Sequence, residues 1–349
     1  WGEAILHGTE LAAEDFNKDG GLDVGGKRYP IRVIAYDTKY KANEALSAAN
    51  RLISEDNVKF ILGPVGAAEA YATQDITTAK KVITLVFAWS PRVLGPKLPF
   101  QFRVSTSTDE FAPPQIRWIG QKIKLKTVGG LFPNDEYGQQ SSKQVIDEYA
   151  KTGTTAFVEL FERDRVDFVP LLTRLIGRGI EAVELDGNSP TTAGLIVKQA
   201  RSLGFTGPFV RSGGPAEREI LQVAGKAAAE GMYLHSPVNP IDPGILAFEA
   251  RHKKKYGSDM SGFMPSFYDG ARMLFEAIQK AGTIEDTEKV AKALEGINHF
   301  QGLQGELGWS SGNYGIPRQI NAPFYIVQIK DGRTVPVARC TYAECKDMN

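Results

Sequence analysis

Residues 60–70, FILGPVGAAEA, decide the fold predicted for this chain. An apolar run leads into a Gly/Pro turn, and small residues follow that suit the start of a helix. This order is typical of a parallel α/β sheet, in which ligands bind at the carboxyl ends of strands and free N–H groups at helix starts hold anions. We therefore expect Val65, Gly66 and Ala67 to border a ligand. An ordinary strand–helix turn without a ligand is the alternative.

A second strand end has the same character. The predicted strand at 82–87 ends in the turn AWSP at 88–91. Its candidates for ligand contact are Phe87, Ala88, Trp89 and Ser90, although the two aromatic side chains alone also fit a core position. Two neighbouring strand ends with small or hydroxyl residues predict half of a binding site.

Composition predicts a globular protein large enough for two domains. The chain has 349 residues, of which 42% are hydrophobic and 23% charged. With 41 basic and 41 acidic residues the net charge is zero, which gives no support for nucleic-acid binding. No apolar run approaches the roughly 18 residues that cross a membrane. The chain begins at Trp1 without an initiator Met, so we expect a processed or truncated piece.

The two cysteines, Cys340 and Cys345, lie close together in sequence. A structural zinc site needs about four ligands, which this pair does not supply. A local disulfide is favoured over two free thiols, and it would indicate an oxidising compartment.

Strand and helix patterns alternate in two blocks along the chain, which predicts parallel sheets with helices on both faces. The first block has expected helices at 2–17, 41–54 and 67–80 and expected strands at 30–37, 58–62, 82–87 and 100–104. The second block runs from 110 to 234, and crossovers are expected at 105–108 and 236–240. Helices at 245–256, 261–281 and 287–294 and a hairpin at 324–338 follow. The three helices lack matching strands, so we expect the chain to return there to its first lobe.

The second block has its own candidates. Residues 133–138, PNDEYG, follow a predicted strand, and Tyr137 can offer a ring face and a hydroxyl to a ligand. A helix cap by Asn134 or Asp135 is the alternative, and both can hold together. Tyr268 lies in an apolar helix and fits a core position as well as a ligand contact.

Enzyme chemistry has little support. The histidines are scattered, and the sequence contains no Walker sequence or visible carboxylate pair. We predict no catalytic residue, no metal and no cofactor.

The chain resembles the periplasmic Leu/Ile/Val-binding proteins, the type I solute-binding components of branched-chain-type ABC importers. The resemblance covers nearly the whole chain, and its markers are specific through their order and spacing. They are GTELAAEDFN at 8–17, Tyr36-Asp37, Leu62-Gly63-Pro64, NDEYG at 134–138, QARSLG at 199–204 and Tyr268-Asp269-Gly270.

The resemblance implies two Rossmann-like lobes with parallel sheets, joined by three crossover strands and closing on a ligand like a flytrap. The first lobe would comprise 1–105 with 238–316, and the second 106–237 with 317–349. The family begins with a strand and a ligand-facing loop that this chain lacks. Trp1 then falls where the family has an aromatic lid residue, and we expect the missing segment to exist in the native molecule.

The implied binding positions match the amino-acid binders only in part. Ala67 stands where they have a serine for the ligand carboxylate, while Ala88 and Ser90 match their carbonyl and threonine, and Tyr137 is kept. No acid lies at 212–214, where their ammonium-binding glutamate aligns, and Arg211 is adjacent. Ser189 and Gly213 complete the predicted set in the second lobe.

This difference favours a ligand without an amine, because burying an unpaired ammonium costs several kcal/mol. We predict an aromatic or hydrophobic carboxylate, held by the amides of Ala67 and Ala68, by Ser90 and by Arg211. Its ring would contact Trp1, Phe87, Trp89, Tyr137 and Tyr268. A branched-chain amino acid, with Asp186 or Glu69 replacing the glutamate, and an amide or urea-like solute are the alternatives.

The resemblance implies binding without chemistry in a periplasmic or otherwise extracytoplasmic compartment. We expect a monomeric subunit that closes by hinge motion and presents its ligand to an ABC permease. A ligand-sensing domain of a receptor or regulator is the alternative role.

Overall fold

A computed structural model describes residues 2–310 and 318–348 of the chain. The chain divides into two compact units, one from residues 1–107 and 248–322 and one from residues 108–247 and 323–349. It therefore passes between the units three times. The second passage falls inside α10 (Pro243–Tyr256).

The first unit is built on a sheet whose inner strands are parallel. β4 pairs in parallel with β3 and β5, β5 pairs in parallel with β13, and β12 pairs antiparallel with β13 and β11. The described order is β11 (Phe300–Gly302), β12 (Gly305–Ser310), β13 (Gln319–Asn321), β5 (Gln101–Arg103), β4 (Ile83–Phe87) and β3 (Phe60–Val65). Every residue of β4 is buried, as its apolar sequence ITLVF predicts.

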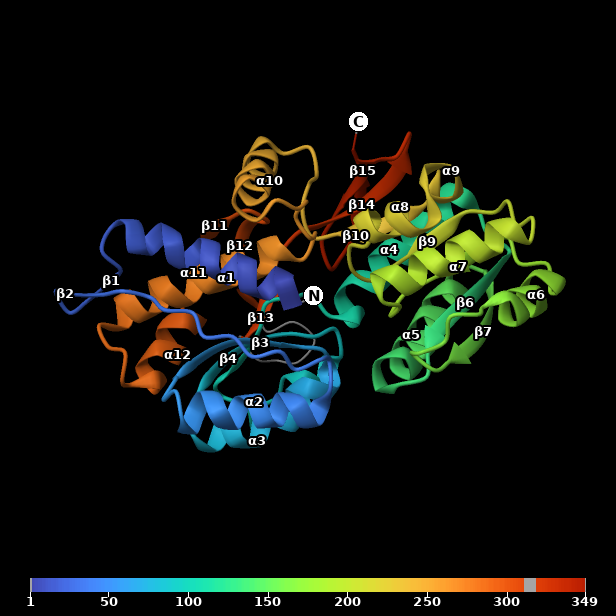
Figure 1. Ribbon diagram of the computed structural model, residues 1–349. Helices are drawn as coiled ribbons and strands as arrows, with labels where there is room; N and C mark the ends of the chain where they lie inside the picture. Colours follow the sequence, from blue (N-terminus) through green and yellow to red (C-terminus); the bar gives the residue numbers. More distant parts are fainter. Residues whose placement is uncertain (1, 311–317, 349) are drawn as a thin grey trace. The chain divides into compact units, whose positions relative to one another are not determined.

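Helices pack in pairs in the first unit. α1 (Gly2–Lys18) lies along α11 (Met264–Ala281), which also packs on α12 (Thr287–Glu295) (Figure 1). α2 (Ala42–Ser54) lies beside α3 (Ala67–Ala79). Gly8 allows the first pair to approach closely, because a Cβ there would lie 3.0 Å from the Met264 carbonyl oxygen.

The prediction of a strand at 30–37 is wrong for this structure. The strands found nearby form a short hairpin, β1 (Leu22–Val24) with β2 (Lys27–Tyr29). Residues 30–38 form no backbone ladder with any described strand, and the outermost strand β3 pairs with β4 alone. An apolar segment becomes a strand only where another strand accepts its hydrogen bonds.

The second unit contains a mixed sheet with a parallel core. Strands β7, β6, β8, β9 and β10 run parallel, whereas β14, β15 and β16 add antiparallel pairs. The described order is β16 (Cys345–Asp347), β15 (Arg333–Cys340), β14 (Phe324–Lys330), β10 (Tyr233–Ser236), β9 (Phe209–Arg211), β8 (Ala182–Glu184), β6 (Thr127–Pro133) and β7 (Thr155–Phe161).

Connecting helices cover this sheet and supply its core. They are α4 (Thr108–Ile123), α5 (Glu136–Lys151), α6 (Val169–Gly177), α7 (Pro190–Ser202), α8 (Glu217–Ala224) and α9 (Lys226–Ala229) (Figure 1). One buried cluster joins strand and helix side chains, among them Leu131, Leu172, Val183, Ile196 and Phe209. This core holds the strand ends that carry the predicted site residues.

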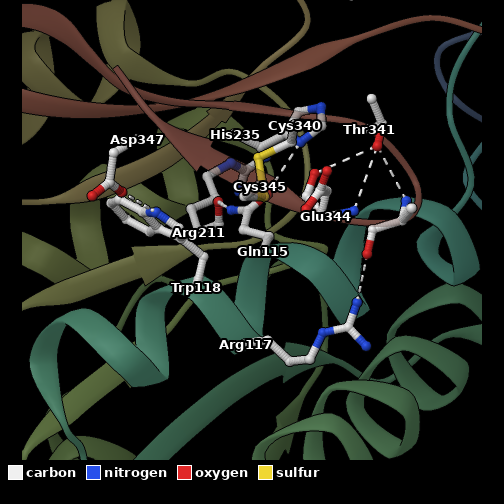
Figure 2. Close-up of a disulfide and its surroundings, with 11 residues drawn as sticks. Gln115, Arg117, Trp118, Arg211, His235, Cys340, Thr341, Glu344, Cys345 and Asp347 are labelled. Atoms are coloured by element: carbon white, nitrogen blue, oxygen red, sulfur yellow. Dashed lines mark hydrogen bonds between the residues drawn. A yellow bond between two sulfur atoms is a disulfide. The ribbon is translucent and has the colours of Figure 1, made fainter. Parts of the chain in front are cut away.

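A disulfide closes the C-terminal hairpin of the second unit. Cys340 ends β15 and is bonded to Cys345 at the start of β16 (Figure 2). The hairpin is also held to α4, because Arg117 donates to the Ala343 carbonyl at 2.9 Å and Trp118 Nε1 donates to Asp347 Oδ1 at 2.7 Å. The chain end is thereby fixed to the helix that begins at Thr108.

Across the described ranges, no helix combines the length and the apolar content that crossing a membrane requires.

Candidate ligand-binding site

The turn from β3 into α3 leaves backbone amides free at a helix start. Gly66 has φ 102° and occupies the N-cap position, and no described side chain caps the helix there. The amides of Ala67 and Ala68 have no hydrogen-bond partner among the described residues. Glycine is required at 66 because other residues rarely adopt a φ of 102°, and a Cβ would also lie 2.8 Å from the ring of Tyr40. Unpaired amides in the first turn of a helix form a site for an anionic group.

An aromatic cluster adjoins this turn. The Gly66 amide donates to the Phe87 carbonyl at 2.9 Å, and Val65 pairs with Phe87 across the sheet. The Phe87 ring contacts three further rings, with centroid distances of 5.5 Å to Trp89, 5.3 Å to Phe263 and 5.0 Å to Phe267. The first unit therefore places apolar ring surface next to free amides.

Ala88 and Ser90, which were predicted as polar ligand contacts, already have partners. The Ala88 carbonyl accepts from Ser105 Oγ at 3.2 Å. Ser90 Oγ shares a hydrogen bond of 2.8 Å with the Tyr71 hydroxyl, and the Ser90 carbonyl accepts from Arg103 at 2.7 Å. A carbonyl oxygen can accept a second hydrogen bond, so Ala88 keeps this capacity.

In the second unit, Tyr137 lies in the first turn of α5, which follows β6, and points its hydroxyl at Asp186. The hydroxyl donates to Asp186 at 3.0 Å and shares a hydrogen bond of 3.2 Å with Thr108. Burial raises the pKa of Tyr137 well above its usual value, and the charge of Asp186 adds to this effect. The hydroxyl is thus engaged within the unit, which leaves the ring for other contacts.

Asp186 belongs to a buried group of two acids and one base. Glu184 is 1% exposed and accepts from the Tyr149 hydroxyl at 3.0 Å and from Ser212 Oγ at 2.7 Å. Burial, with the neighbouring Asp186, raises the pKa of Glu184 to about 7, and burial also raises the pKa of Asp186. Arg211 supplies the positive charge of the group.

Arg211 is directed at the backbone. It is 1% exposed and donates to the carbonyl oxygens of Gly214 at 3.0 Å, Leu185 at 3.2 Å and Asn188 at 2.9 Å. Its predicted contact with a ligand carboxylate would have to come in addition to these three bonds. What the structure shows is that Arg211 holds the turns that follow β8 and β9.

Ser189 and Gly213 have structural tasks in these turns. Ser189 caps α7, accepting from the Thr192 amide at 3.2 Å. At Gly213 a Cβ would lie 1.9 Å from Asp186 Oδ1, so any larger residue would collide with the carboxylate. The space beside Gly213 is therefore filled by an acid that comes from position 186.

Tyr268 makes its contacts away from the aromatic cluster. The Tyr268 hydroxyl donates to Asp15 of α1 at 2.7 Å, and its ring lies 4.6 Å from that of Phe248. Trp1 lies outside the described residues.

Phe263 and Phe267 of the aromatic cluster were not predicted from the sequence. They are four residues apart at the start of α11, a spacing that puts two side chains on one helix face. The sequence shows this spacing, but the spacing fits core packing as well as ligand contact. Within the described ranges, no cluster of His, Cys, Asp or Glu side chains is arranged to hold a metal ion.

Comparison with known proteins shows the family. The sequence profile described as periplasmic binding protein matches residues 1–334. A leucine-, isoleucine-, valine-, threonine- and alanine-binding protein of Pseudomonas aeruginosa is 28% identical over 317 residues, which are 88% of this chain and 81% of the relative.

Solved structures share the fold. The branched-chain amino acid transporter substrate-binding protein LivJ of Streptococcus pneumoniae, in complex with isoleucine, has a TM-score of 0.84 at 22% identity, covering 99% of this chain and 95% of its own. A solute-binding protein of an ABC transporter from R. palustris, in complex with benzoate, has a TM-score of 0.82 at 17% identity. The match covers 99% of this chain and 93% of the R. palustris chain.

The chain belongs to the periplasmic binding protein family. It shares its fold with a substrate-binding protein of a branched-chain amino acid transporter. The relatives named above are binding proteins.

Proposed function

We propose that this protein is the extracytoplasmic solute-binding subunit of an ABC importer, and that it binds a small aromatic or hydrophobic carboxylate without an amine. One observation carries the proposal: the free amides of Ala67 and Ala68 lie next to the aromatic cluster around Phe87. A carboxylate bound by the amides would leave its apolar group beside the rings.

The hydrogen-bond donors at the start of α3 support a carboxylate ligand over an amino acid. Hydrogen bonds from amides to an ionised carboxylate are about twice as strong as neutral ones, and the helix start adds its partial positive charge. Gly213 stands at one position where an acid would be needed, and Asp186 already accepts from Tyr137 and Ser141. An ammonium group would have to compete with these donors. The R. palustris neighbour that binds benzoate supports the view that this fold accommodates such acids.

A branched-chain or aromatic amino acid is the second candidate, and two buried acceptors favour it. The Asp186 carboxylate fills the space at Gly213, and Asn188 Oδ1 has no hydrogen-bond partner among the described residues, although Asn188 is 1% exposed. An unpaired buried acceptor is costly and is stabilised by a donor such as an ammonium group. The names of the Pseudomonas and Streptococcus relatives point in the same direction.

A thermal-shift screen with matched ligands tests the proposal. L-Phenylalanine is compared with 3-phenylpropionate, and L-leucine with 4-methylpentanoate, because each pair differs only in the amine. Benzoate completes the set. A ligand at 100 times its Kd stabilises the folded protein by about 2.7 kcal/mol, so binding is visible as a higher Tm. Stabilisation by the acids and not by their amino acids supports the proposal, and the reverse supports the second candidate.

The variant Ala67→Pro tests whether the backbone amide of residue 67 binds the ligand carboxylate. Proline is tolerated in the first helical position, and glycine before it adopts the extended ψ that proline requires. The variant removes one N–H group and keeps the helix. We expect unchanged unfolding and a loss of about tenfold or more in affinity for 3-phenylpropionate. Ala79→Ser, at the exposed C-terminal end of α3, is the control and should bind normally.

A further inference from the structure

Glu69 is a buried acid in the same helical turn as the free amides. It is the third residue of α3, two positions after Ala67, and it is 2% exposed. Its Oε1 atom has no hydrogen-bond partner among the described residues. An ionised carboxylate buried with an unpaired oxygen is unfavourable, whereas a protonated one carries no charge and has an O–H to donate.

The groups around Glu69 do not neutralise its charge. Thr38 hydrogen-bonds the carboxyl group, and Asp37 is the charged neighbour, from the segment before α2. Tyr40, from the same segment, covers Gly66 at the helix start. On α3 itself, the Tyr71 hydroxyl is engaged with Ser90 of the turn after β4. No basic side chain of the described residues contributes to the charge balance at Glu69.

We propose that carboxylate binding at the start of α3 is linked to a proton on Glu69, so that the site takes its acid together with one proton. This inference rests on the proposed function, because it needs a carboxylate at the amides of Ala67 and Ala68. The protonated carboxyl group leaves the helix start positive and available. The ionised one places a negative charge in the same turn and opposes the incoming anion.

The titration of Glu69 agrees with this geometry. Burial raises its pKa from 4.5 to about 7, with the hydrogen bond from Thr38 opposing and the charge of Asp37 adding to the rise. A bound carboxylate raises this pKa further, because a like charge disfavours ionisation. Binding therefore takes up a proton at pH 8, where free Glu69 is ionised, and hardly any at pH 6. If only the protonated form binds, affinity falls about tenfold from pH 6 to pH 8.

Isothermal titration calorimetry measures this uptake directly. Benzoate and 3-phenylpropionate, which stay ionised across the range, are titrated at pH 6 and pH 8 in phosphate and in Tris. These buffers have very different ionisation enthalpies, so the dependence of the binding heat on buffer gives the number of protons bound. We expect about 0.5 to 1 proton at pH 8 and about 0.1 at pH 6.

Two variants make the result specific to Glu69. Glu69→Gln has nearly the same size and cannot titrate, so its uptake should be near zero and its affinity equal at both pH values. Asp37→Asn keeps Glu69 and removes the neighbouring charge, so uptake should begin at lower pH. If Glu69→Gln does not fold, Asp37→Asn decides the question. Proton uptake that begins at a lower pH than in the wild type supports the proposal, and an unchanged pH dependence of the uptake rejects it.

The outcomes separate this inference from the proposed function. Acid binding without proton uptake, or with equal uptake in wild type and Glu69→Gln, overturns the inference and leaves the proposed function standing. Absence of binding by every acid in the set rejects both. Uptake that disappears in Glu69→Gln supports the inference.

Discussion

The Tyr137 hydroxyl donates to the Asp186 carboxylate at 3.0 Å, joining the first turn of α5 to the turn after β8. A phenol has one proton to give, so the Thr108 hydroxyl, 3.2 Å away, donates to the Tyr137 oxygen. The hydroxyl that suggested a polar ligand contact is thus used within the unit. The ring is the part of Tyr137 that remains for the ligand contact we propose.

Tyr137→Phe should separate stability from binding. Removing the hydroxyl takes a buried hydrogen bond from a carboxylate, and we expect a loss of about 2 kcal/mol in unfolding free energy, measured with urea. Affinity for 3-phenylpropionate should change less than about threefold, because the ring remains. Tyr342→Phe, at a residue that is 68% exposed, is the control and should have no effect. A large loss of affinity in Tyr137→Phe with normal stability would show that the hydroxyl meets the ligand.

His235 makes the second unit sensitive to acid. It is 4% exposed and packed against Phe324 and Phe111, and burial, with the charge of Arg211, lowers its pKa from 6.5 to about 3. The unfolded chain then binds more protons than the folded one below pH 6.5, so stability is lost as the pH falls toward 3. From this group we expect a loss of about 3 kcal/mol between pH 7 and pH 4.

The variant His235→Phe tests this assignment by urea unfolding at both pH values. Its stability should depend much less on pH, although its absolute value also changes because Gln115 loses a partner. His299→Gln, on an exposed side chain, should keep the acid dependence of the wild type. An unchanged acid dependence in His235→Phe would contradict the prediction.

Glu69 should make the first unit less stable at high pH. Its folded pKa of about 7 lies above the ordinary 4.5, so the unfolded chain binds fewer protons between these values. Stability therefore falls as the pH rises from 4.5 to 7 and stays low above that. We expect Glu69→Gln to be more stable than wild type at pH 8 by about 3 kcal/mol and similar to it at pH 4.5. If Glu69→Gln and the wild type had equal unfolding free energies at pH 8, ionisation of Glu69 would not destabilise the folded protein, and the prediction would be wrong.

The disulfide should stabilise the C-terminal hairpin by a modest amount. Cys340 and Cys345 are five residues apart, and a loop of this length contributes about 2 kcal/mol in the chain-entropy description. We expect Cys340→Ala/Cys345→Ala, or reduction of the wild type, to lower the unfolding free energy by that amount. Affinity for the acids should stay within about twofold, because Arg117 and Trp118 still hold the hairpin on α4. Loss of binding on reduction would show that the disulfide positions the site.

Element types were largely predictable because apolar periodicity is local. The strand β4 and the helix α11 follow directly from their sequences. Residues 30–37 have the same apolar pattern as a strand but find no described partner, and pairing between distant segments cannot be read from one segment.

The candidate site was predictable at strand ends and less so in its details. Gly66 and Phe87 were identified from the turns they occupy, and they are in contact. The use of Arg211 by backbone carbonyls and the place of Asp186 beside Gly213 depend on side-chain directions, which sequence spacing does not fix.

The most direct test of the account is the ratio of two dissociation constants, measured by calorimetry at pH 6 for 3-phenylpropionate and L-phenylalanine. The two compounds share the ring and the carboxylate and differ in the ammonium group alone. The account predicts that 3-phenylpropionate binds at least about tenfold more tightly, because an ammonium without a free acid costs several kcal/mol on burial. Tighter binding of L-phenylalanine would contradict it and would assign Asp186 as the partner of the amine.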